Sequence, residues 1–132
     1  MSELPHNSLT EAKKWLAESR EELDAALALK GHSDIRGRII CLHAHLTAEK
    51  SIKALLIFRD ILVPRVHDLF DLLSRLADKD KFNIDENDLE ILNPWSIRGR
   101  YPADLPDATN VMVEHALIAA QNVYDAANST IN

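Results

Sequence analysis

Apolar residues recur every three or four positions along most of the chain, which is the period of an amphipathic α-helix. The first such segment predicts a helix over about 9–30. Ser8 or Thr10 is the expected N-cap, because Ser8 precedes Glu11 by the three residues of a capping box. Gly31 is expected to end this helix. The apolar positions of the segment are Leu9, Ala12, Leu16, Leu23 and Leu27.

The most apolar periodic segment follows, and Ser33 or Asp34 is its expected N-cap. This second helix is expected to run to about 58–62 and to end before Pro64, because a residue that precedes proline disfavours the helical conformation. Apolar residues on more than one face predict that it is the central helix. They are Ile35, Ile39, Leu42, Leu46, Ile52, Leu55, Leu56 and Ile57.

The second half of the chain predicts three further helices, and no alternating β pattern or internal repeat occurs in the sequence. The helices are expected at 67–76, 85–92 and 107–127, with a polar break at 78–83 and a proline-containing ordered loop at 93–107. The segment at 85–92 is short and acidic. The sequence therefore predicts an all-α protein, an up-and-down bundle of four long helices plus one short helix. Alanines in the last helix indicate close packing in the core or, alternatively, a dimer interface.

Length and composition favour one ordinary globular domain over residues 1–132. Hydrophobic residues make up 46% of the chain and charged residues 27%, which is typical of soluble domains. The single cysteine, Cys41, excludes an internal disulfide and lies in an apolar run, so we expect an inert buried thiol. No apolar stretch is long enough for a membrane helix, and no signal peptide is evident. We therefore expect a cytoplasmic protein without membrane contact.

Charge is distributed unevenly along the chain, whose formal net charge is −6. The segment 36–65 contains six basic and two acidic residues, whereas 68–90 contains eight acidic and three basic residues. The overall charge excludes a strongly basic coat for nucleic acid but allows a local basic patch. Two interpretations stay open: an ordinary solvated surface, or a basic pole for an anionic ligand beside an acidic pole for a partner.

The densest group of ionisable side chains lies in the second predicted helix. His45, Glu49 and Lys53 are spaced four residues apart and share one face, whereas His43 and Lys50 share a neighbouring face. A Glu–Lys pair at this spacing is often a simple helix-stabilising contact. Polar residues in so apolar a helix also favour a ligand-binding site. The His45–Glu49 spacing suits a metal but supplies two ligands at most, so we expect no metal and no other cofactor.

A second candidate site lies before the last predicted helix. Arg98 and Arg100 flank a glycine, and Tyr101 follows them. Guanidinium groups bind phosphate in a bidentate manner and a tyrosine ring stacks on a base, although such arginines also clamp helix ends. The pair His67-Asp68 at the start of a helix is consistent with capping or with catalysis. No template of a known catalytic class occurs in the sequence.

Four short motifs occur in order along the chain. They are Ala12-x-x-Trp15-x-x-x-Ser19, the segment from His43 to Ile57, His67-Asp68-Leu69 followed by Leu72-Leu73, and Arg100-Tyr101-Pro102 before an alanine-rich helix. In this order and spacing, the chain resembles the HEPN family of small all-α domains over almost its full length. The resemblance implies a helical bundle, usually a homodimer, that binds nucleotides. It also implies a minimal nucleotidyltransferase as partner in a toxin–antitoxin pair.

Many proteins of this family are metal-independent ribonucleases that carry an arginine a few residues before a histidine. That spacing occurs here from Arg38 to His43, from Arg36 to His43 and from Arg38 to His45. It lies in the second helix, whereas the ribonucleases carry it later in the bundle, and matches of this kind are common by chance. The chain therefore resembles the branch that lacks the standard motif.

Three hypotheses follow. The first is a nucleotide- or RNA-binding module whose ligand contacts are His45, Glu49, Lys50, Lys53, Arg98, Arg100 and Tyr101. The second is a ribonuclease toxin in which Arg38 acts with His43, or Arg100 with His67. The third is a non-catalytic adaptor whose acidic segment 78–90 contacts a partner.

Overall fold

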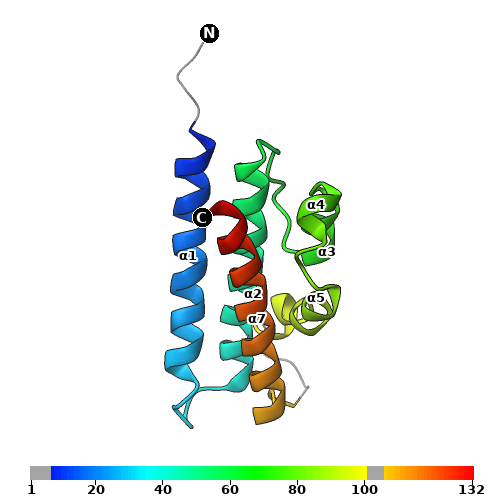
Figure 1. The fold of residues 1–132 in the computed structure, drawn as a ribbon. Helices are drawn as coiled ribbons and strands as arrows, with labels where there is room; N and C mark the ends of the chain where they lie inside the picture. Colours follow the sequence, from blue (N-terminus) through cyan, green and yellow to red (C-terminus); the bar gives the residue numbers. More distant parts are fainter. Residues whose placement is uncertain (1–6, 101–105) are drawn as a thin grey trace.

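Three long helices of 22 residues each form the body of the protein, and they lie side by side (Figure 1). They are α1 (Ser8–Leu29), α2 (Gly37–Phe58) and α7 (Asn110–Ile131). The structure is a computed structural model that describes residues 7–100 and 106–132. Helices α2 and α7 run in the same direction and α1 runs in the opposite one. Helix α2 packs against both α1 and α7, as expected for the central helix.

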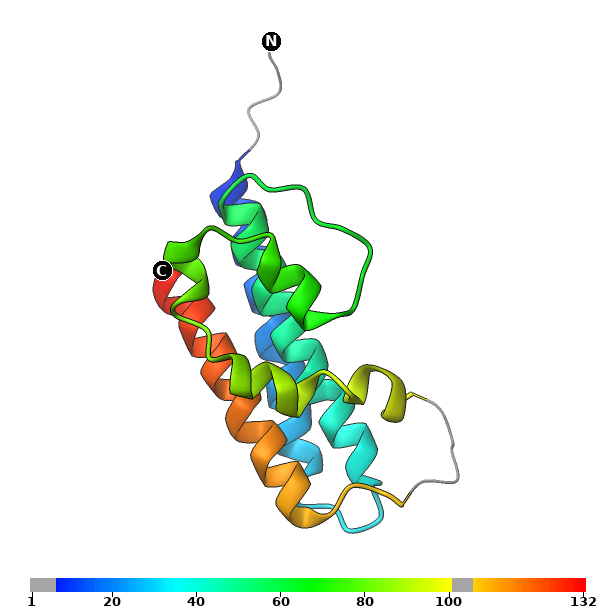
Figure 2. The same cartoon turned by 90° about the vertical axis from the view of Figure 1, so that its right-hand side faces the viewer.

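Four short helices carry the chain back along one side of α2, from the end of α2 to the start of α7 (Figure 2). They are α3 (Leu69–Ser74), α4 (Asp78–Lys81), α5 (Glu86–Leu92) and α6 (Trp95–Arg98). The prediction of an all-α bundle is confirmed, and no strand occurs within the described ranges. The helix expected at 67–76 is present as α3 but has only six residues, so the bundle has three long helices rather than four. The predicted polar break contains α4, and the predicted loop at 93–107 contains α6.

The interruption of the return segment has a physical cause in its polar side chains. The carboxylate of Asp85 accepts a hydrogen bond from the backbone N–H of Asn87 and starts α5 as a separate helix. Asp80 is 2% exposed and accepts two hydrogen bonds from the guanidinium of Arg59, at 2.8 and 2.9 Å. This bidentate ion pair fixes α4 to the end of α2.

Both ends of α1 differ from the predicted caps. Asn7 is the N-cap of α1, and its side chain accepts a hydrogen bond from the backbone N–H of Thr10. The predicted N-cap Ser8 is the first helical residue, and its hydroxyl donates to the carboxylate of Asp60. Gly31 lies in the turn after α1 without a positive φ, so it does not provide the expected left-handed cap.

The N-terminus of α2 is capped from a distant part of the chain. The carboxylate of Asp107 accepts hydrogen bonds from the backbone N–H groups of Gly37 and Arg38, both at 2.9 Å. The predicted caps Ser33 and Asp34 lie outside the helix. Burial raises the pKa of Asp107, but these backbone hydrogen bonds outweigh it and hold the pKa below its usual value. Asp107 therefore joins the start of α7 to the start of α2.

The C-terminus of α2 ends without a glycine. Asp60 adopts the left-handed conformation with φ 59°, and its N–H donates to the carbonyl of Ile57. The N–H of Ile61 donates to the carbonyl of Leu56 at 2.8 Å, which completes a Schellman arrangement. The chain then follows an irregular path through His67 to Asp68, the N-cap of α3.

Small residues on α7 allow the three long helices to approach closely. Four alanines of α7 are fully buried, namely Ala116, Ala119, Ala120 and Ala127. They pack in one core with large side chains such as Leu23 of α1 and Leu55 of α2. This confirms the interpretation of the alanine-rich helix as core. Ala126, in contrast, is half-buried.

Cys41 lies in this core at 0% exposure, and burial, with a smaller effect of Asp107, raises the pKa of its thiol to about 12. The expectation of an inert thiol is confirmed, because the thiolate is the reactive form. Among the described helices, none is long and apolar enough to cross a membrane.

Asp107→Ala should lower the free energy of unfolding by about 1–2 kcal/mol at pH 7, because two backbone N–H groups lose their acceptor. Urea denaturation measures the change. Asp34→Ala is the matched control, since it removes the carboxylate that the sequence pattern favours as the cap, and it should change the stability by less than about 0.5 kcal/mol. Equal losses in both variants would contradict the assigned cap.

Candidate functional site

One face of α2 carries several of the candidate side chains. Arg38, Leu42, His45, Glu49 and Lys53 are spaced three or four residues apart and so lie along one side of the helix. This side packs against the segment that leads into α3 and against α6. The predicted shared face of the last three of these residues is therefore present in the structure.

Glu49 is the centre of a buried polar cluster, and its side chain is 7% exposed. Its Oε2 accepts a hydrogen bond from Nζ of Lys53 at 2.8 Å, and its Oε1 accepts one from Nδ1 of His67 at 3.0 Å. Burial raises the pKa of Glu49, but Lys53 and His67 outweigh it and hold the pKa below its usual value. Glu49 is therefore an ionised carboxylate that two donors compensate.

The His67 side chain is free to contact Glu49 because the next residue, Asp68, caps α3. The carboxylate of Asp68 accepts hydrogen bonds from the backbone N–H groups of Phe70 and Asp71 at the start of α3. The His67 side chain is 58% exposed, so its ring spans from the buried carboxylate to solvent. The capping interpretation of the His67-Asp68 pair is thus confirmed, with Asp68 as the cap and His67 directed to Glu49. The sequence contained one indication of this arrangement, a histidine directly before a residue that is a favourable N-cap.

His45 is fully buried beside this cluster. Its Nε2 donates to the backbone carbonyl of His67 at 3.1 Å, and its Nδ1 lies 3.8 Å from Oε1 of Glu49. Among the described residues Nδ1 has no hydrogen-bond partner. Burial lowers the pKa of His45 to about 4, although Glu49 acts in the opposite direction. The ring is therefore neutral at pH 7 and presents an unfilled acceptor to the interior.

A glycine allows the end of α6 to lie directly on α2. A Cβ at Gly99 would come within 2.6 Å of the Cβ of Leu42 and within 3.0 Å of the carbonyl oxygen of Arg38. Nη1 of Arg38 donates to the carbonyl of Gly99 at 3.0 Å and holds this contact. The two arginines beside the glycine are directed to different surroundings.

Arg100 lies on the same side as the buried cluster. It is exposed, its Nε donates to the carbonyl of Ser96 at 2.9 Å, and its charge helps to lower the pKa of His45. No carboxylate in the described part of the chain pairs with its guanidinium. His67 and the Glu49–Lys53 pair are thus in direct contact, whereas Arg100 acts on the cluster through its charge at His45. The predicted base-stacking residue Tyr101 lies outside the described residues.

Arg98 faces α7. Its guanidinium lies 4.4 Å from the ring centroid of Trp95, and its Nε is buried without a partner in the described structure. It lines a small cavity of about 220 Å³ together with Met112 and His115 of α7. Arg98 and Arg100 therefore do not converge on one site. The sequence alone could not decide whether they would.

His43 and Lys50 lie on the side of α2 that faces α1. Nδ1 of His43 bonds to Glu22 at 2.7 Å, and Nζ of Lys50 bonds to Glu22 at 2.8 Å and to Glu18 at 3.3 Å. This carboxylate network on α1 accounts for both side chains and separates them from the His45 cluster. Arg38 shares a face with His45 but not with His43, so the arrangement does not bring the Arg38–His43 pair together.

No group of three His, Cys, Asp or Glu side chains in residues 7–100 and 106–132 is arranged to hold a metal ion. Glu49 is occupied by the ammonium of Lys53 and by Nδ1–H of His67. The cluster therefore offers a cation, an exposed imidazole and a neutral buried imidazole, which is a set that suits an anionic ligand or proton transfer.

The model of the HEPN domain family matches residues 12–130 of the chain. No curated protein matches it. Two solved structures resemble it over most of their length. The crystal structure of TT1696 from Thermus thermophilus is 26% identical with a TM-score of 0.77, and it covers 89% of this chain and 96% of its own. The structure of ST0689, an archaeal HEPN homologue, is 19% identical with a TM-score of 0.70, covering 92% and 98%.

The low pKa of His45 predicts a pH-dependent stability. The unfolded chain binds a proton at His45 near pH 6.5 and the folded chain only near 4, so stability is full above 6.5 and is lost as the pH falls toward 4. The loss should be about 1.4 kcal/mol per pH unit between pH 6 and pH 5. Urea denaturation at several pH values should show this slope and its disappearance in His45→Gln. His32→Gln, at an exposed histidine, should retain the slope; the interpretation fails if both variants behave alike.

Proposed function

The chain belongs to the HEPN domain family, and on that premise we propose that it is a helical module that binds the phosphate groups of a nucleotide or of RNA. The observation that carries the proposal is an exposed Arg100 that has no carboxylate partner in the described part of the chain and whose charge acts on His45, the residue that bonds to the backbone of the exposed His67. A guanidinium without a carboxylate partner suits the bidentate recognition of phosphate.

Each residue of the cluster has a distinct part in this proposal. Arg100 contacts the phosphate directly, and His67 contacts it through the ring nitrogen that does not face Glu49. Lys53 is largely buried and neutralises Glu49, so that the carboxylate does not repel an anion. Its ammonium also lies 6.0 Å from the ring centroid of Trp15, which holds it on the inner side of the cluster. Tyr101, next in sequence to Arg100, is the proposed base contact.

A second candidate function is metal-independent cleavage of RNA, which the Glu49–His67 contact favours. A carboxylate that accepts from Nδ1–H orients the imidazole and leaves Nε2 available as a general base. Arg100 then stabilises the charge that develops on the phosphate. The neutral His45 is too weak a base for this step, because its pKa is about 4. His67 with Arg100 is thus the pair that we propose for catalysis.

The proposed assembly is a homodimer, and its partner is a minimal nucleotidyltransferase in a toxin–antitoxin pair, as the family membership favours. The exposed apolar face of α7 supports the dimer. Val111 is 62% exposed, Met112 42% and Ile118 58%, and the three lie on the outward side of the helix. The nucleotidyltransferase partner and the cytoplasmic location stay predictions.

A panel of mononucleotides and a short single-stranded RNA should raise the melting temperature of the protein if one of them binds the folded state. We expect a shift on the order of 10 °C at a ligand concentration of about 100 times the dissociation constant. Arg100→Ala should abolish the shift. Arg75→Ala, at an exposed arginine of the α3 C-terminus that pairs with Asp71, is the matched control and should retain it.

The same samples distinguish the two functions. Intact RNA on a denaturing gel, with a shift that depends on Arg100, supports binding alone. Shortened RNA that His67→Gln prevents supports cleavage. If no ligand shifts the melting temperature, the phosphate-binding proposal is wrong.

Ile118→Asp should convert a dimer into a monomer, because it places an unpaired charge in the proposed apolar interface. Light scattering coupled to size-exclusion chromatography measures the mass. Leu62→Asp is the control, since Leu62 is 88% exposed and lies beyond the C-terminal end of α2. A monomeric wild-type protein would refute the dimer.

A further inference from the structure

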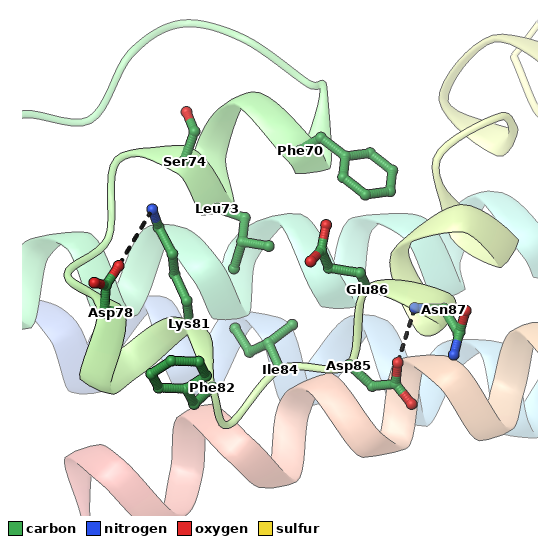
Figure 3. Close-up of a pocket in the computed structure, with 10 residues that line it drawn as sticks. All are labelled: Phe70, Leu73, Ser74, Asp78, Lys81, Phe82, Ile84, Asp85, Glu86 and Asn87. Carbon is green, nitrogen blue, oxygen red and sulfur yellow. Dashed lines mark hydrogen bonds and ion pairs between the residues drawn. The ribbon is translucent and has the colours of Figure 1, made fainter.

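A groove of about 530 Å³ lies between α3, α4 and α5, away from the residues of the proposed phosphate site (Figure 3). Its floor is apolar. Leu73 and Ile84 pack into the core at 6% and 5% exposure, and Phe70 is partly buried beside them. The volume lies within the range of about 300–1,000 Å³ that is typical of binding sites.

Phe82 forms one side of this groove and is 86% exposed. It is the residue that caps the C-terminus of α4, so the backbone of the short helix holds it in place. Nothing in the described part of the chain covers its ring. A large aromatic side chain that a folded backbone presents to solvent is typical of an interaction surface.

The rim of the groove is acidic, with Asp78, Asp85 and Glu86 against the single cation Lys81. Lys81 is paired with Asp78 at 3.9 Å, and Asp85 caps α5. Glu86 has no cationic partner among the described residues. Figure 3 shows its carboxylate directed into the groove, between Phe70 and Ile84. The groove therefore combines an apolar floor with an uncompensated negative charge.

We propose that this groove binds a basic amphipathic segment of a partner protein. An aliphatic or aromatic residue of that segment packs between Phe82 and Ile84, and a lysine or arginine one helical turn away pairs with Glu86. Charge complementarity selects this occupant, because the negative rim repels nucleic acid and acidic peptides. The docking mode is that of an amphipathic helix in an apolar groove. The proposal does not rest on phosphate binding at Arg100.

Two fluorescently labelled helical peptides test the proposal. Each has 14 residues, which is about four helical turns. Both carry leucines at every third or fourth position, and they differ only in lysine or glutamate at the polar positions. In fluorescence anisotropy with the full chain, the lysine peptide should bind and the glutamate peptide should not. Raising the salt from about 50 to about 300 mM should weaken binding several-fold. Phe82→Ser and Glu86→Gln should each weaken it at least fivefold.

Matched controls keep the result specific. Leu62→Ser removes another exposed apolar side chain, beyond the end of α2, and Glu21→Gln removes an exposed carboxylate from α1. Neither should change the affinity, and Phe82→Ser should leave any nucleotide-induced melting shift unchanged. The proposal is overturned if the lysine peptide does not bind, or if the controls weaken binding as much as the groove variants. Self-association that only Phe82→Ser abolishes, without peptide binding, would overturn it in favour of a second copy.

Discussion

The ionised carboxylate of Glu49 is the constraint on which the arrangement of the site depends. It lies inside the bundle on the most apolar helix, where an uncompensated charge would be strongly destabilising. Lys53, one turn along α2, supplies one donor, but the second comes from His67 on the segment before α3. The need for that second donor fixes the path of the chain after α2. His45, in turn, holds the same segment through its backbone carbonyl.

Close backbone approaches fix the opposite end of the site. Gly99 lies against α2 where any side chain would collide with Leu42, and Gly37 lies where a Cβ would come within 2.6 Å of the carbonyl oxygen of Ala108. The first contact places Arg100 near His45, and the second brings Asp107 to the amides that it caps. Both glycines therefore act by leaving room for a neighbouring backbone, and not by forming turns. Gly99 positions the exposed Arg100, and Gly37 positions the cap Asp107.

The sequence was sufficient to predict features that depend on local, periodic spacing of residues. The spacing of apolar residues predicted the three long helices, and a spacing of four residues placed His45, Glu49 and Lys53 on one face. It was insufficient where partners are distant. Asp107 caps a helix that begins 70 residues earlier in the chain, and His67 bonds to a carboxylate 18 residues away. It also overestimated the helix at 67–76, because apolar spacing does not reveal where capping side chains divide a segment into short helices.

The return segment of short helices has a consequence for the cooperativity of the molecule. Helix α2 packs against both α1 and α7, so the central amides of these helices should exchange with solvent mainly through global unfolding. Helices α3 to α6 are one to two turns each, and separate anchors such as Arg59–Asp80 hold them to α2. We therefore expect α3 to α6 to open at lower free energy than the three long helices. The face that carries His67 and Arg100 would then be able to change without unfolding of the three-helix frame.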